Sequence, residues 1–218
     1  MLHDWDWRGA EASFARALEL APGNVLVLRR AGALAWSLGR LEEAIGLSRR
    51  ALEQDPLSAP AYHNLGFALH AADRFAEAEE AYREVLELAP QRVGTRPYLA
   101  LTLLARGRGE EALAEVLQEP HEAFRLWALA IVHHALGQGA ESDAALRELI
   151  EKYAEDGAYQ VAEIHAARRA ADAAFEWLER AYAQRDPGLA ELKLSPHLRS
   201  LHGDPRWGAF LKKMGFEE

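Results

Sequence analysis

Histidine is the residue type whose spacing in this chain comes closest to a metal or acid–base site. His133 and His134 are adjacent, and His63, His70 and His165 lie elsewhere in the chain. Two metal ligands on one helix need i,i+4 spacing, as in the H-E-x-x-H zinc motif, and no histidine pair has it. The chain has no cysteine, which excludes disulfides, thiolate ligands and a cysteine nucleophile. The histidines are therefore interpreted as surface or groove side chains, and we expect no metal and no cofactor.

Two glycine-containing stretches resemble parts of ligand-binding loops. Gly137-Gln138-Gly139 matches the start of a phosphate loop, and Arg106-Gly107-Arg108-Gly109 matches a nucleic-acid tract. Both lie where a turn between helices is expected, and neither follows a strand, so both predict turns. No Ser/His/Asp arrangement or carboxylate pair stands out among the acidic residues. We therefore predict a non-enzyme without catalytic residues.

The charge balance argues against nucleic acid as a partner. Acidic residues outnumber basic ones, 34 to 25, for a formal net charge of −9, whereas phosphate contacts need clustered Lys and Arg. The N-terminal residues 1–5 lack the basic flank and apolar core of a signal peptide. The longest apolar run, 126–132, is too short to span a bilayer. We expect no membrane insertion and a cytoplasmic location, with a periplasmic one left open for a fragment of a membrane-anchored regulator.

The spacing of prolines and small residues predicts the elements that carry these side chains. Pro22, Pro56 and Pro90 recur at a step of 34 residues. The same step is kept by Ala10, Ala44 and Ala78. A fixed 34-residue period with this pattern of small and large residues is the tetratricopeptide (TPR) signature, in which each unit is a helical hairpin that must stack on a neighbour.

Within the repeat that begins at Ala59, the pattern predicts how two helices meet. Gly66 and Ala78 are expected at close contacts, because a larger side chain there would push the paired helices apart. Tyr82 and Leu65 would fill the remaining space. Pro90 is expected to follow and end a helix over 75–88.

These repeats predict an all-α fold, a right-handed TPR superhelix of antiparallel helical hairpins with a C-terminal capping segment. The array covers residues 1–187, with a half repeat at 1–24 and repeats at about 25–58, 59–92, 93–121, 122–154 and 155–187. Residues 188–218 form the cap, since Asp204-Pro205 reads as an N-cap followed by a proline in the first helical position. Ser58 is expected to cap the helix that starts at Ala59.

The first repeat lacks its first helix. Ala10, Phe14 and Leu18 would then present an apolar stripe without a hairpin partner, and such a stripe is an association site. The sequence therefore predicts a homodimer, or concentration-dependent association, through the N-terminal half repeat.

Two stretches resemble a narrower group within the TPR family. Asp4-Trp5-Asp6-Trp7 precedes the first helix, and the segment 174–181 leads into Asp186-Pro187 and Asp204-Pro205-Arg206-Trp207. Together they are similar to the C-terminal TPR arrays of bacterial adenylate-cyclase-like and winged-helix transcriptional regulators. That resemblance implies the regulatory part of a larger signalling protein, although the sequence has no catalytic or DNA-binding domain. An excised fragment and a short relative without its effector both fit.

A carboxylate clamp, which in some TPR proteins grips a C-terminal carboxylate, is not expected. In register the chain supplies Arg29 and Asn64, but Ala33, Pro97 and Leu101 stand where further Asn or basic residues are required.

The concave groove is the predicted binding site. First helices should project aromatic and polar side chains into it, and the candidate site residues are Trp36, His63, Asn64, Phe67, His70, Tyr98, Trp127, His134 and Tyr159. Aromatic anchors with few charges suit an apolar or helical peptide. His70 and His134 are expected to titrate near neutrality, and Trp127→Ala should weaken partner binding at least about tenfold. The opposing interpretation is that several of these side chains are core between repeats.

Three functions are compatible with this groove. The first is a protein- or peptide-binding scaffold whose partner the sequence does not identify. The alternative is a ligand-sensing regulatory domain that takes a small apolar molecule in the groove. The third is an array that chiefly mediates self-association.

Overall fold

The computed structural model describes residues 5–216, and helices make up most of this range. Asp4 of the Asp4-Trp5-Asp6-Trp7 stretch lies outside the described residues. The α-helices are α1 Trp7–Leu20, α2 Val25–Ser37, α3 Leu41–Gln54, α4 Ala59–Ala71, α5 Phe75–Leu88, α6 Thr95–Ala105, α7 Gly109–Val116, α8 Glu122–Ala135, α9 Gly139–Tyr153, α10 Ala158–Ala167, α11 Ala171–Gln184 and α12 Pro205–Lys213. Two 3₁₀ segments, η2 Pro187–Glu191 and η3 Pro196–Leu201, precede α12.

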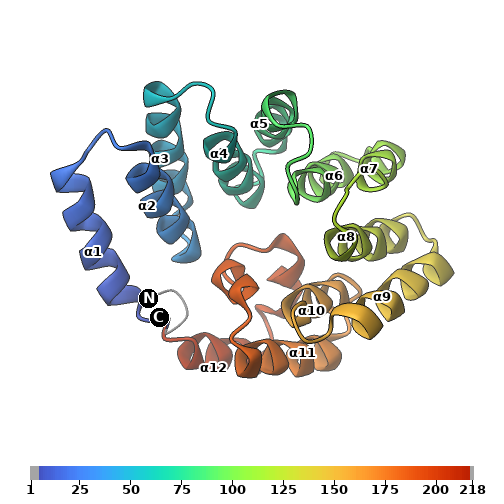
Figure 1. The fold of residues 1–218 in the computed structure, drawn as a ribbon. Helices are drawn as coiled ribbons and strands as arrows, with labels where there is room; N and C mark the ends of the chain where they lie inside the picture. The colour runs from blue at the N-terminus through green and yellow to red at the C-terminus, as the bar shows by residue number, and fades with distance from the viewer. Residues whose placement is uncertain (1–4, 217–218) are drawn as a thin grey trace.

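The helices pair into hairpins that follow one another around a curve (Figure 1). α2 packs on α3, α4 on α5, α6 on α7, α8 on α9 and α10 on α11. The first helices also contact each other in order, α2 with α4, α4 with α6, α6 with α8 and α8 with α10. They form the inner wall of the curve, so the predicted all-α superhelix of TPR hairpins is confirmed.

The contact predicted at Gly66 is present between α4 and α5. A Cβ atom built on Gly66 would lie 2.8 Å from Cε1 of Tyr82. Tyr82 is fully buried, so its ring has no free space into which it could move. Glycine at this position lets the two helices approach with the tyrosine between them.

We expect Gly66→Leu to lower the free energy of unfolding by about 1–3 kcal/mol, because overpacking a filled contact forces side chains off their preferred rotamers. Denaturant unfolding measures the effect. The matched control is Gly46→Leu, since Gly46 is exposed on α3 and a Cβ there would meet nothing within 4 Å. Equal denaturation midpoints for the two variants would contradict the close contact at Gly66.

Helix starts agree with the sequence at some positions and differ at one. Asp204 accepts a hydrogen bond from Arg206 N and caps α12, as expected. Ser58 occupies the N-cap position of α4 as expected, but its side chain makes no capping hydrogen bond. A capping hydroxyl accepts from the second or third helical N–H. Pro60 has no N–H, and the N–H of Ala61 is donated to the Ser58 carbonyl at 2.9 Å.

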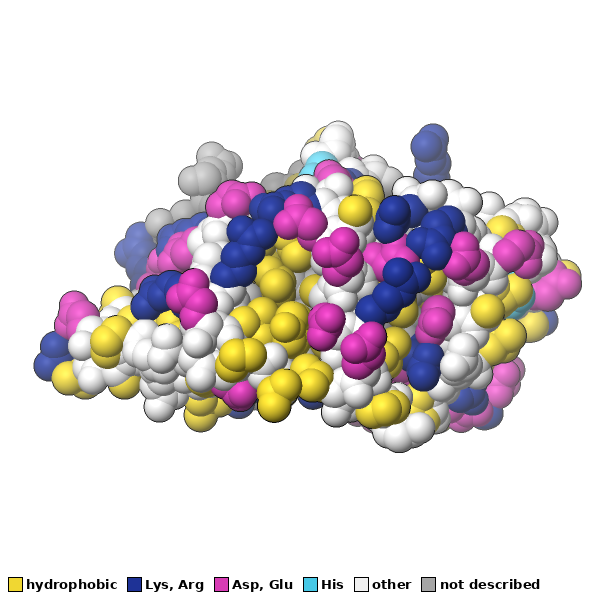
Figure 2. Space-filling view, turned by 90° about the horizontal axis from the view of Figure 1, so that it is seen from above, with side chains coloured by type: hydrophobic (Ala, Val, Ile, Leu, Met, Phe, Trp, Pro, Cys, Tyr) yellow, Lys and Arg dark blue, Asp and Glu magenta, His cyan; other side chains and the backbone are white. Residues whose placement is uncertain are grey.

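Ion pairs link neighbouring helices on the outer surface. Figure 2 shows Lys and Arg interleaved with Asp and Glu over one face, with hydrophobic side chains between them. Arg49 of α3 pairs with Glu77 of α5 at 3.1 Å, and Arg108 pairs with the buried Glu79 at 2.7 Å. The exposed Arg49–Glu77 pair contributes little to stability, as is usual for a pair of exposed charges.

The C-terminal segment runs into the inside of the curve before it returns to the outside (Figure 1). The leucines of η2, η3 and the turn between them are almost fully buried, namely Leu189, Leu192, Leu194, Leu198 and Leu201. Ser200 Oγ donates to Ala166 O of α10 at 2.8 Å. Arg199 pairs with Asp73, in the turn between α4 and α5, at 2.8 Å. Residues 187–201 therefore pack on the first helices across the concave side.

Helix α12 covers α11 and then meets the start of the chain. Phe210 of α12 lies 6.4 Å from Tyr182 of α11, which agrees with a cap on the last repeat. Beyond α12, the Trp7 Nε1–H donates to Met214 O at 2.8 Å, and the Trp7 ring stacks on Phe216 at 4.6 Å. The two ends of the array are thus joined, and the curve closes into a ring (Figure 1).

A search of the described residues for helices that could cross a bilayer finds none with the required length and apolar character.

Candidate functional site

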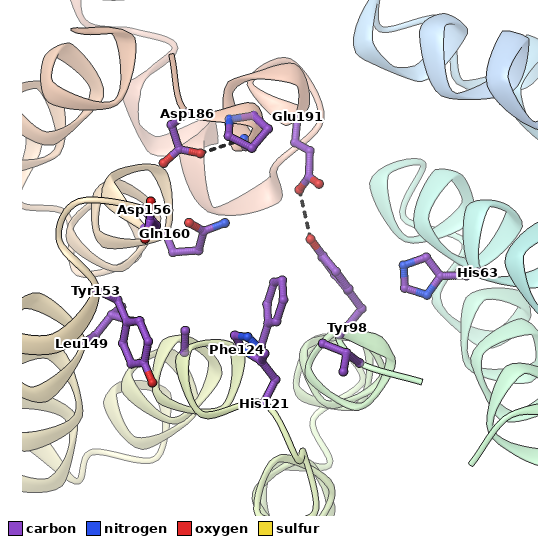
Figure 3. Close-up of a pocket in the computed structure, with 16 residues that line it drawn as sticks. His63, Tyr98, His121, Phe124, Leu149, Tyr153, Asp156, Gln160, Asp186 and Glu191 are labelled. Carbon is purple, nitrogen blue, oxygen red and sulfur yellow. Dashed lines mark hydrogen bonds between the residues drawn. The ribbon is translucent and has the colours of Figure 1, made fainter. Parts of the chain in front are cut away.

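A cavity of about 530 Å³ opens between the inner helices and the start of the C-terminal segment (Figure 3). Its volume lies in the range of small-ligand pockets. It is lined by side chains and backbone from α4, α6, α8, α9, α10, η2 and the turns between them, namely His63, Val93, Gly94, Tyr98, His121, Ala123, Phe124, Leu149, Tyr153, Asp156, Gly157, Gln160, Asp186, Pro187, Gly188 and Glu191. In Figure 3, Phe124, Gln160 and Glu191 point toward its middle.

Glu191 is the carboxylate that faces this space most directly. Its Oε2 accepts a hydrogen bond from the Tyr98 hydroxyl at 3.0 Å. Burial raises the pKa of Glu191 to about 7, against the lowering effect of the Tyr98 bond, and the nearby Asp186 raises it further. No positive charge compensates, because within residues 5–216 Glu191 forms no ion pair and its Oε1 accepts no hydrogen bond.

Asp186 has a structural task. Its Oδ2 accepts from Tyr159 N at 2.9 Å and its Oδ1 from Gly188 N at 2.8 Å. These bonds fix the turn that leads from α11 into η2. Burial raises the pKa of Asp186, and the two backbone hydrogen bonds offset only part of that rise. Both oxygens are thus committed to backbone groups, so Asp186 adds negative charge to the cavity wall without an unused carboxylate oxygen.

A smaller cavity of about 20 Å³ lies between the C-terminal segment and the inner helices. Glu163 of α10 and Glu191 both line it, and Ser195 Oγ donates to Glu163 Oε1 at 2.5 Å. Burial and then the charge of Glu191 raise the pKa of Glu163 to about 8. The contact between the C-terminal segment and the inner wall therefore contains two carboxyl groups that resist ionisation.

The raised pKa of Glu163 predicts that the free energy of unfolding falls as the pH rises above neutrality. A carboxyl group whose pKa is raised on folding contributes stability that is complete below its ordinary range and is lost as pH rises to the folded value. From pH 6.5 to 8.5 the free energy of unfolding should fall by about 1–2 kcal/mol from Glu163, since one pKa unit is about 1.4 kcal/mol. Glu163→Gln should flatten this decline in thermal or urea unfolding measured across pH.

The comparison needs a carboxylate of the same type outside the cavity. Glu87→Gln provides it, because Glu87 is exposed on α5, and its alkaline profile should match the wild type. The buried histidines act in the opposite direction, because burial lowers the pKa of His63 and His70 to about 3 and of His197 to about 4, and the unfolded chain still releases protons from these rings just above pH 6.5. Their contribution is the same in the wild type and in Glu163→Gln, so the test is the difference in unfolding free energy between these two proteins. A difference that stays constant from pH 6.5 to 8.5 would contradict the placement of Glu163.

Several of the predicted site residues do come together. Ring centroids are 5.0 Å apart for Trp36 and Phe67, 5.0 Å for Phe67 and Tyr98, and 5.4 Å for Tyr98 and Trp127. Phe67, His70, Tyr98 and Trp127 also line the small cavity under the C-terminal segment. The aromatic row predicted on the first helices therefore exists, and residues 187–201 lie against it.

Other predicted residues have different surroundings. Tyr159 is fully buried, and a Cβ on Gly188 would lie 2.5 Å from its ring. Asn64 donates from Nδ2 to Arg29 O at 3.2 Å and ties α4 to α2. His134 is exposed and lines a separate hollow with His197. Tyr159, Asn64 and His134 do not line the large cavity, whereas His63 does. That the nine predicted site residues bind a partner stays a prediction.

The expectation that His70 titrates near neutrality is wrong. His70 is 7% exposed, and Thr102 Oγ1 lies 2.9 Å from its Nδ1. Thr102 donates its own proton to Tyr98 O, so the His70 Nδ1–H is the donor in that contact. Burial, reinforced by His197 and Arg199, lowers the pKa of His70 to about 3, and the ring stays neutral.

Most residues of the cavity wall were not among the predicted site residues. The sequence did not single out His121, Phe124, Gln160 or Glu191 as site residues. Asp186 was noted only as part of a stretch that resembles other TPR arrays, and not as a site residue. Phe124 follows the same helix face as Trp127 and could have been found from that spacing. Glu191 carries no such signal, because it lies in a short 3₁₀ segment. Among residues 5–216, no three His, Asp or Glu side chains are arranged to hold a metal ion.

Comparison with known proteins agrees with this geometry. Residues 2–66 and 57–117 each match a family model described as tetratricopeptide repeat. The chain therefore carries tetratricopeptide repeats. The small glutamine-rich tetratricopeptide repeat-containing protein 2 of Mycosarcoma maydis is 32% identical over 85 residues, or 39% of this chain. The match spans 24% of that protein, about a quarter of its length.

Solved structures show the same fold. A tetratricopeptide repeat protein from Parabacteroides merdae ATCC 43184 superimposes with a TM-score of 0.68 at 17% identity, covering 96% of this chain and 78% of its own. YrrB, described as a TPR protein with an unusual peptide-binding site, gives a TM-score of 0.51 at 17% identity, covering 92% and 97%.

Proposed function

We propose that this chain is a non-catalytic scaffold that binds a peptide or a segment of a partner protein, and that the segment docks in the 530 Å³ cavity. Proteins built from tetratricopeptide repeats are generally scaffolds for proteins or peptides, and the YrrB structure is described as having a peptide-binding site. The observation that carries the proposal is an open, aromatic-walled cavity beside the segment 187–201, which packs against the inner helices over part of the concave side.

Phe124 is the side chain on which we expect such a segment to depend. It is half-buried, it lies 5.2 Å from His121 and 6.5 Å from Trp127, and it points into the cavity (Figure 3). Aromatic side chains in partly enclosed pockets are the usual hot spots of peptide recognition, and their truncation commonly costs about 2 kcal/mol or more.

The test is selection of peptides from a display library on the full chain, followed by affinity measurement. We expect Phe124→Ala to weaken the selected peptides at least about tenfold. Leu117→Ala is the control, since Leu117 is a 61% exposed apolar residue outside the cavity. Circular dichroism shows whether each variant is folded. Failure to select any peptide, or equal binding by folded Phe124→Ala, would contradict the proposal.

A small molecule is the second candidate occupant, because the volume of the cavity alone would accommodate one. Thermal-shift screening of metabolites against the full chain separates this function from peptide binding. A metabolite that raises the melting temperature of the wild type but not of Phe124→Ala would favour ligand sensing.

The wider context of the scaffold is also part of the proposal. The resemblance to arrays of bacterial adenylate-cyclase-like and winged-helix regulators supports a regulatory role within a larger signalling protein, in the cytoplasm and without nucleic-acid contact by this array. The genomic sequence around the start codon tests this role. An open reading frame without any effector domain, and without such a domain in a neighbouring gene, would count against it.

Homodimerisation through α1 cannot use the stripe that was predicted to lack a partner, because Ala10 is buried and Phe14 and Leu18 pack against the core. Support for association is confined to the C-terminal end of α1, where Leu20 is 68% exposed, and to Leu26 of α2, which is 56% exposed. Exposed leucines favour association at the C-terminal end of α1. Light scattering over a wide concentration range tests it, and a constant monomer mass would exclude the dimer.

A further inference from the structure

We propose that the cavity selects a lysine side chain of the docked segment, with its ammonium group on Glu191 Oε1 and its hydrocarbon stem against Phe124 and Tyr98. This inference rests on the proposed peptide-binding function and assigns the chemistry of the same site.

The charge of the cavity wall is of one sign. Asp156, Asp186 and Glu191 line it, and none of its lining residues within the described chain is Lys or Arg. Elsewhere most of the arginines are paired with carboxylates, as in the Arg49–Glu77 and Arg199–Asp73 pairs. A half-buried carboxylate without a cation is costly unless a partner neutralises it. The group that complements this wall is a cation.

The walls also suit the apolar part of a long cationic side chain. Phe124 points into the cavity, and Tyr98 is held with its hydroxyl on Glu191 (Figure 3). Tyr153 is fixed in a similar way, because its hydroxyl donates to Glu122 Oε2 at 2.7 Å. Lysine buries its methylene stem along apolar surface while its ammonium stays near polar groups. Aromatic faces add attraction for a cation within about 6 Å of their centroids.

The geometry of Glu191 favours an ammonium over a guanidinium. Arginine binds a carboxylate best through two parallel N–H···O bonds that use both oxygens. Here Oε2 already accepts from Tyr98, which leaves Oε1 as the open acceptor. A compact ammonium needs one carboxylate oxygen and can direct its remaining N–H groups elsewhere. The Gln160 side chain, which points toward the same space, offers a further acceptor (Figure 3).

The experiment uses the full chain and a matched set of blocked tripeptides with lysine, norleucine or arginine in the central position. Norleucine has the lysine stem without the ammonium group, so the difference between the two isolates the charge. We expect the lysine peptide to bind at least about tenfold more tightly than the norleucine peptide, measured by NMR chemical-shift titration. The arginine peptide should bind less tightly than the lysine peptide.

Glu191→Gln removes the charge but keeps an acceptor for Tyr98, and it should abolish the preference for lysine over norleucine. Glu87→Gln on the exposed face of α5 should retain it. n-Butylamine distinguishes a free amine from a peptide side chain, and we expect it to bind more weakly than the lysine peptide. Lysine and norleucine peptides that bind equally, or a lysine preference that survives Glu191→Gln, would overturn the inference.

The inference and the proposed function can fail separately. If display-selected peptides depend on Phe124 but carry no lysine and show no loss with Glu191→Gln, the cavity is a peptide site with a different preference. Butylamine that binds as tightly as the lysine peptide would overturn the assignment to a peptide side chain.

Discussion

Replacing Trp127 with alanine should lower the free energy of unfolding by about 3–5 kcal/mol, the usual range for a large aromatic side chain removed from a core. Trp127 is 2% exposed and belongs to the core shared by the first helices. Its ring contacts Tyr98 of α6 and Phe124 of α8, so its loss opens a cavity between successive repeats. Urea denaturation followed by circular dichroism measures the change.

The matched control is Trp177→Ala. Trp177 is half-buried on α11, with Arg180 over its ring at 4.9 Å, and its loss should cost clearly less. A Trp127→Ala protein as stable as the wild type would contradict its place in the core. The predicted tenfold loss of partner binding on the same substitution stays a prediction, and it must be measured where the variant is still folded.

Trp7→Ala should have a comparable effect, about 3 kcal/mol or more, concentrated at the two ends of the chain. Trp7 is 4% exposed, stacks on Phe216 and donates its Nε1–H to Met214 O. Removal takes away both the apolar contact and a buried hydrogen bond that joins residues 207 positions apart. Hydrogen exchange should become faster in α12 and at the start of α1, while α4 and α5 stay protected.

Trp5→Ala serves as the comparison, because Trp5 is only half-buried and lies beside Trp7 at 5.9 Å. In the Trp5→Ala protein, the amide hydrogens of α12 should exchange at the wild-type rate. If Trp7→Ala left the exchange of α12 unchanged, the ring would not depend on this contact, and the array would behave as an open solenoid whose ends are independent.

The hairpins were predictable from the sequence because their contacts are local. The helix expected over 75–88 is α5, and Gly66 meets Tyr82 at the predicted place, since both follow from one repeat and its neighbour. Each repeat needs only the adjacent one to bury its apolar face. The missing side-chain bond at Ser58 shows the limit of a residue preference, because Pro60 has no N–H and the N–H of Ala61 is donated to the Ser58 carbonyl.

The course of the C-terminal segment was not predictable in the same way. Its leucines occur in short 3₁₀ turns without a helical period, and its polar contacts join distant parts of the chain. Arg199 and Asp73 are 126 residues apart. This segment supplies Glu191, Gly188 and Pro187 to the cavity. The cavity therefore could not be predicted from the repeat pattern alone. The predicted groove residues are consequently near the site, but most lie beneath the segment that covers them.

A crystal structure of the full chain with a display-selected peptide tests the central claim most directly. We expect the peptide in the cavity between α6, α8, α10 and η2, with residues 187–201 in place and a lysine ammonium about 3 Å from Glu191 Oε1. A peptide lying along the concave surface in place of residues 187–201, or bound outside the cavity, would contradict it.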